Sequence, residues 1–119
     1  MAEYLCKMTV KMDDIISYGY CALRQYPKSE RFILVTMTAN CMWELSALIQ
    51  SAVDATDKRR KLAYMEQADK ELKKLKSMVR SGMNLKFLPF AKYEFLSGLL
   101  VELGRMIGAW QHQISQHRD

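Results

Sequence analysis

Apolar residues recur at helical spacing along most of the chain, and short breaks divide it into segments. At the first break, Pro27 disfavours helical geometry for Tyr26, so a helix ends there. Ser29 is expected to cap the helix that follows, since a serine side chain can accept from a free backbone N–H. At the second break, Thr56 or Asp57 can cap the next helix in the same way.

The third break runs from residue 82 to residue 89 and separates the last two helices. Gly82 suits the left-handed position that ends many helices, and Pro89 suits a first helical turn. We therefore expect helices over residues 3–25, 29–54, 57–81 and 89–116. Short connections between helices predict one all-α domain over residues 1–119, an antiparallel up-down four-helix bundle.

The third predicted helix carries one apolar stripe and a basic surface. The stripe comprises Leu62, Met65, Leu72, Leu75 and Val79, with Ala68 between them. The cations that fall roughly opposite it are Arg59, Lys70, Lys73 and Lys74, with Arg60 and Lys76 on its flanks. A row of cations on one side of a bundle is an arrangement that a phosphate backbone can use.

The second predicted helix is apolar around its whole circumference, and Glu44 is its one charge between residues 32 and 53. It could span a membrane, although Glu44 and several polar residues interrupt it at a high cost in lipid. We favour a soluble helix packed against its own bundle on one side and against another subunit on the other. Phe32, Val35 and Trp43 are the residues expected at that interface.

The fourth predicted helix has a broad apolar face and a separate side rich in small residues. Gly104 and Gly108 lie on that side, where glycine costs about 1 kcal/mol relative to alanine. We expect another helix to approach closely there and assign both glycines to the oligomer interface. Glu102 and Arg105, three residues apart, are expected to form an ion pair.

Composition supports a folded, cytoplasmic protein. The 119 residues are 50% apolar with 5 glycines and 2 prolines, which argues against disorder. The three cysteines Cys6, Cys21 and Cys41 form no close pair, so we expect free thiols in a reducing compartment. The N-terminus shows no export signal pattern.

Charge is distributed unevenly along the chain. Residues 58–92 carry +8, whereas the remainder carries −3, within a net charge of +5. This asymmetry is typical of a polyanionic partner, although a solvated helix face would show it too. Aromatic residues in or beside the basic region (Tyr64, Phe87, Phe90 and Tyr93) could stack on single-stranded bases if exposed, or could belong to the core.

Catalytic machinery is not evident in the sequence. His112 and His117 are five residues apart, which puts them on different helix faces and suits no metal. Cys41 lies in the most apolar helix, where a buried thiol is inert. Because no phosphate loop or metalloprotease motif occurs either, we expect no catalytic residues, no metal and no cofactor.

Two stretches resemble known families. Residues 26–32 (YPKSERF) resemble the turn of the four-helix-bundle proteins encoded in 23S rRNA intervening sequences. Residues 102–110 (ELGRMIGAW) resemble the fourth-helix signature of the accessory variability determinant (Avd) proteins of diversity-generating retroelements. Residues 58–64 and the Leu/Lys-rich helix ending at Gly82 fit the same group. The resemblance covers about residues 20–111 and favours Avd.

The resemblance to Avd implies a barrel-shaped homopentamer of four-helix bundles. Such proteins bind the retroelement's reverse transcriptase and its template RNA, support mutagenic retrohoming and are not catalytic. This chain is less basic than many of them, so its nucleic-acid contact could depend more on the polymerase. The partner of the basic residues could be RNA, DNA or the polymerase.

From the basic surface we assign nucleic-acid or polymerase binding to Arg59, Arg60, Lys70, Lys73, Lys74, Lys76, Arg80, Lys86 and Arg105. Two alternatives stay open. One is a protein of the rRNA-intervening-sequence type with a ribosome-related or unknown role. The other is a helical adaptor whose basic face meets an acidic protein.

Overall fold

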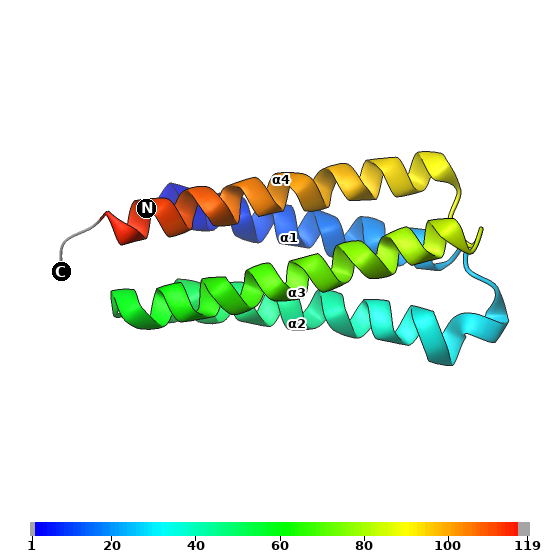
Figure 1. Ribbon diagram of the computed structural model, residues 1–119, viewed down its shortest axis with the longest axis horizontal. Coiled ribbons are helices and arrows are strands. Elements are labelled where there is room, and N and C mark those ends of the chain that lie inside the picture. Colours follow the sequence, from blue (N-terminus) through cyan, green and yellow to red (C-terminus); the bar gives the residue numbers. More distant parts are fainter. Residues whose placement is uncertain (1, 117–119) are drawn as a thin grey trace.

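Four long helices lie side by side in the computed structural model, which describes residues 2–116 and their side chains from residue 7 onward (Figure 1). They are α1 (Ala2–Leu23), α2 (Thr36–Asp54), α3 (Lys58–Asn84) and α4 (Phe90–Ser115). Each packs antiparallel to the next, and α4 returns to pack against α1. This confirms the predicted all-α up-down bundle. His117 lies outside the described residues, and so does the side chain of Cys6.

The core lies along the axis shared by the four helices. The predicted stripe of α3 is buried at Met65, Leu72, Leu75 and Val79, while Leu62 is half-buried. On α4, Trp110 is fully buried. Not every apolar residue of α4 is buried, since Phe95 is 56% exposed and its ring packs against Tyr18 of α1.

The second helical segment begins differently from the prediction. Ser29 does not cap a helix, because it lies inside a 3₁₀ turn, η1 (Lys28–Glu30). A wide π-helical turn, η2 (Arg31–Val35), follows, and regular α2 starts at Thr36. The Thr36 hydroxyl donates to the carbonyl of Arg31 at 2.6 Å, which satisfies a carbonyl in this irregular stretch.

The start of α3 confirms one predicted cap, since the Asp57 carboxylate accepts from the backbone N–H of Arg60 at 2.7 Å. Its end corrects another prediction. Gly82 is not the left-handed residue that terminates the helix, because it lies buried within α3 and packs against Tyr26. The helix runs to Asn84, about one turn further than predicted.

Lys86 takes the terminating position instead, with φ of 67°. The N–H of Phe87 donates to the carbonyl of Gly82, and that of Lys86 donates to Met83, which is the paired bonding of a Schellman motif. Pro89 then immediately precedes α4, which begins at Phe90 rather than at the proline.

One side of the segment from Lys28 to Asp54 has no cover from its own bundle. Phe32 is 86% exposed and Trp43 is 52% exposed. Among the described residues, this is the one helical stretch long and apolar enough to cross a membrane, and 28% of its most apolar window is buried. The helix α2 was expected to be apolar around its whole circumference. In the structure, one of its apolar faces is buried in the bundle and another is exposed.

Candidate nucleic-acid interface

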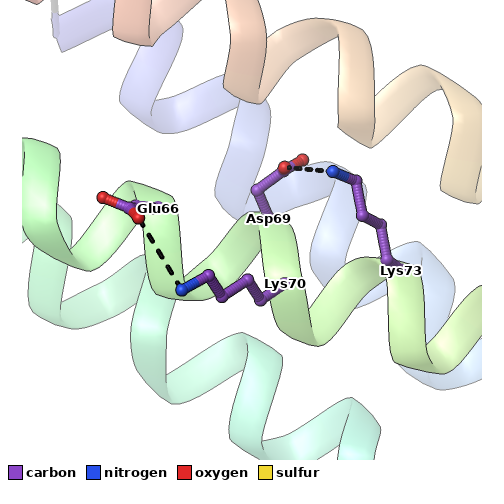
Figure 2. Close-up of polar contacts among 4 residues, drawn as sticks. All are labelled: Glu66, Asp69, Lys70 and Lys73. Atoms are coloured by element: carbon purple, nitrogen blue, oxygen red, sulfur yellow. Dashed lines mark ion pairs between the residues drawn. The ribbon is translucent and has the colours of Figure 1, made fainter.

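The middle of α3 is electrically neutral, although the sequence predicted a basic face there. Lys70 pairs with Glu66 at 3.7 Å and Lys73 pairs with Asp69 at 3.1 Å (Figure 2). Residues 66–74 contain three acidic residues and three lysines, and each lysine is paired with one of the acids. We call these residues the neutral segment. A phosphate would have to displace a carboxylate to contact these lysines.

Lys74 completes this arrangement. Its ammonium lies 3.0 Å from the carboxylate of Glu71, and hydrogen bonding to Glu71 raises the pKa of Lys74. On α4, Arg105 lies 3.8 Å from Glu102, as the spacing predicted. Such exposed pairs contribute only about 0–1 kcal/mol to stability, so their main consequence is to cancel local charge.

At the N-terminal end of α3, two of the four consecutive cations support the fold. The Lys61 ammonium donates to the carbonyls of Ala52 and Val53, both at 3.1 Å, and so caps the end of α2. Lys58 donates to the carbonyl of Ser115 at 3.3 Å.

The other two cations at this end, Arg59 and Arg60, are exposed. Their side chains make no ion pair with any described side chain. We call these two residues the proximal cluster, because they lie at the bundle end where α1 begins and α4 ends (Figure 1).

Three further cations, Lys76, Arg80 and Lys86, form what we call the distal cluster. None is paired with an acidic side chain within residues 7–116, and Arg80 and Lys86 are exposed. Lys76 is half-buried, and its Nζ lies 3.6 Å from the place of a Cβ atom on Gly104. The proximal and distal clusters are separated by about 30 Å along α3, at 1.5 Å per residue.

The predicted interface residues fall into two groups. Phe32 and Trp43 are exposed, and the space around Gly108 is open. Gly104 faces its own subunit, where a Cβ atom would make an ordinary contact with the Leu72 side chain at 3.4 Å. Val35 is half-buried and lines a pocket between α1 and the start of α2.

Trp43 is held in place by α1. Its indole N–H donates to the hydroxyl of Tyr20 at 2.7 Å, and the two rings are tilted with their centroids 6.4 Å apart. The exposed aromatic surface of α2 therefore has a fixed geometry.

The titratable side chains offer little chemistry. The Cys41 thiol donates to the carbonyl of Glu71, and burial raises its pKa to about 12, which leaves it almost wholly protonated at neutral pH. Among the described residues, no three His, Cys, Asp or Glu side chains gather as metal ligands would.

Three further cations were not predicted as binding residues, because they lie in the part of the chain with net negative charge. They are Arg24, Lys28 and Arg31. The structure gathers all three around one pocket. Their spacing of four and three residues would place them on one face of a continuous helix, but Pro27 breaks the helix between Arg24 and Lys28. Of the four aromatics considered for stacking, Phe90 is exposed, whereas Tyr64, Phe87 and Tyr93 are half-buried against the core.

A search of the curated proteins finds no match to the chain. The model of the bAvd-like family matches residues 7–114, which spans all four helices. Of the two resemblances noted in the sequence, the match supports the one to Avd. The chain therefore belongs to the bAvd-like family of accessory variability determinant proteins.

Proposed function

We propose that this protein is a non-catalytic accessory factor that binds the reverse transcriptase of a diversity-generating retroelement and its template RNA. Membership of the bAvd-like family supports the role. The observation that carries the RNA contact is the presence of unpaired cations at both ends of α3. Unpaired arginine and lysine side chains bind phosphates without first losing a carboxylate partner.

The two clusters would contact separate stretches of one RNA. Because the neutral segment lies between them, the chain has two short patches about 30 Å apart instead of one continuous strip. Contacts of this kind carry little sequence information, so the polymerase and the RNA shape would supply specificity. Repeating the patches in several subunits would multiply a weak contact by avidity.

Assembly into a ring-like homo-oligomer, expected to be a pentamer in the cytoplasm, is part of the proposal. The exposed apolar side chains Phe32 and Trp43 support it, since soluble monomers rarely leave such patches uncovered. The fixed geometry of Trp43 suits a contact residue. Gly108 remains a candidate for close approach of a second copy, whereas Gly104 faces Leu72 of its own subunit.

The direct experiment is co-expression with the reverse transcriptase and template RNA of its retroelement, followed by capture on a tag carried by the polymerase. The wild-type protein should be retained together with RNA. The variant Arg59→Glu/Arg60→Glu/Arg80→Glu should lose RNA while keeping its oligomeric mass, because all three side chains are exposed.

The matched control removes the ion pairs of the neutral segment without changing net charge, as Glu66→Gln/Lys70→Gln/Asp69→Asn/Lys73→Gln. This control should retain RNA. Capture of polymerase without the accessory protein would contradict the proposal. If the accessory protein is retained on the polymerase but binds no RNA at low salt, it is instead an adaptor that contacts an acidic protein surface.

A further inference from the structure

A pocket of about 360 Å³ lies at the corner between the end of α1 and the start of α2. We call it the corner pocket, and its lining residues are Tyr20, Leu23, Arg24, Tyr26, Pro27, Lys28, Arg31 and Val35. Its volume is in the range of small-ligand sites, which begins at about 300 Å³.

The lining of the corner pocket is positively charged. Arg24, Lys28 and Arg31 contribute three cations, and none of the lining residues is acidic. All three are exposed, and none forms an ion pair with a described side chain. An anionic group such as a phosphate would therefore find several charged donors there without competition from a carboxylate.

An aromatic ring lies beside these cations. Tyr20 is 39% exposed, and the hydrogen bond from Trp43 restrains its hydroxyl. A restrained, partly exposed ring can stack with any nucleobase, since every base has a π face. An acidic peptide would use the cations but would gain little from the tyrosine ring.

The corner pocket lies at the bundle end where Lys86 of the distal cluster follows α3. Tyr26 lines the pocket, and its ring packs against Phe87 at a centroid distance of 5.7 Å. The same side chain contacts Gly82 of α3. Phe87 directly follows Lys86, so a strand bound at Lys86 would lie at the same end of the bundle as the pocket.

We propose that the corner pocket holds one nucleotide of single-stranded RNA, with its phosphate among Arg24, Lys28 and Arg31 and its base against Tyr20. This inference rests on the proposed function for the identity of the polyanion. It adds a second binding element, built from the end of α1, the turn that follows it, η1 and η2, to the cations of α3.

The test uses a uridine hexanucleotide with one 4-thiouridine, which cross-links to adjacent side chains under long-wavelength light. Cross-linked peptides are identified by mass spectrometry, and affinity is measured by anisotropy of a labelled hexanucleotide. The proposal expects cross-links at Tyr20. The variant Arg24→Gln/Lys28→Gln/Arg31→Gln should bind at least roughly tenfold more weakly, with a salt slope smaller by up to about 2.

Two substitutions at one position separate stacking from charge. Tyr20→Phe keeps the ring and should keep binding, whereas Tyr20→Ala should weaken it by roughly tenfold. The neutral-segment control should bind like the wild type. Unchanged affinity in Tyr20→Ala, or cross-links elsewhere with none at Tyr20, would overturn the assignment.

Hexaglutamate serves as the competing occupant. Displacement of the hexanucleotide by equimolar hexaglutamate would overturn the proposal in favour of an acidic protein segment. If template-length RNA binds but the hexanucleotide leaves Tyr20 untouched, the corner pocket fails while the proposed function stands. If RNA of neither length binds, the proposed function itself fails.

Discussion

The hydroxyl of Tyr26 occupies the space that a Cβ atom on Gly82 would need. Tyr26 follows the end of α1 and Gly82 lies in the last turns of α3, so this contact joins two helices that are not consecutive. A mid-helix glycine is unfavourable by about 1 kcal/mol relative to alanine, and here the close approach of a tyrosine explains it.

We expect Gly82→Ala to destabilise the protein by about 1–2 kcal/mol, because the cost of overpacking exceeds the gain in helix propensity. Tyr26→Phe should restore only part of that loss, since it removes the hydroxyl oxygen but leaves the ring carbon Cζ 2.7 Å from the position of the new methyl group. Denaturant unfolding of both single variants and the double variant measures the coupling. Gly98→Ala, in open space on α4, is the control and should be stabilising. Additive effects of the two substitutions would contradict this account.

Lys86 is the described non-glycine residue with a left-handed backbone, at φ of 67°. We expect Lys86→Gly to raise the free energy of unfolding by about 0.5–1 kcal/mol, because it removes the steric penalty of a side chain in that conformation. Lys86→Ala keeps the penalty and should leave stability nearly unchanged. Both variants should weaken RNA binding equally, since both remove the same cation; an effect of only one of them would count against a phosphate contact by Lys86.

The two described cysteines should differ sharply in reactivity. Cys21 is exposed, whereas Cys41 is buried and burial raises its pKa to about 12. Because the thiolate is the reactive form, a maleimide at pH 7 should label Cys21 rapidly and Cys41 only after unfolding. Peptide mapping of the labelled protein distinguishes the sites. Rapid labelling of Cys41 in the folded protein would show that α2 and α3 separate at that point.

The regular parts of this fold could be predicted from spacing alone. The stripe through Leu72 and Leu75 placed α3 correctly, and Asp57 proved to be a true N-cap. The entry to α2 could not be predicted, since Ser29 is compatible both with a cap and with the 3₁₀ turn that tertiary packing selects. Gly82 was misread for a similar reason, because a glycine at a helix end and a glycine under a tyrosine look alike in sequence.

The candidate site was predicted only in part. The sequence identified α3 as the basic helix but treated its lysines as a free row. The spacing of Asp69 to Lys73 and of Glu71 to Lys74 is that of intrahelical ion pairs, and this signal could have revealed the neutral segment. The corner pocket was missed because Pro27 breaks the helix between Arg24 and Arg31, so their helical spacing could not be taken as evidence that they lie together.

The salt dependence of RNA binding tests most directly whether the unpaired cations at the ends of α3 make the contact. Log affinity falls as log salt rises, and each phosphate contact adds about 0.7 to the magnitude of that slope. The magnitude should therefore be smaller by up to about 3 in the variant Arg59→Gln/Arg60→Gln/Arg80→Gln/Lys86→Gln. It should stay at the wild-type value in the neutral-segment control, in which the Glu66–Lys70 and Asp69–Lys73 pairs are removed together. A wild-type slope in the first variant, or a reduced slope in the control, would contradict the account.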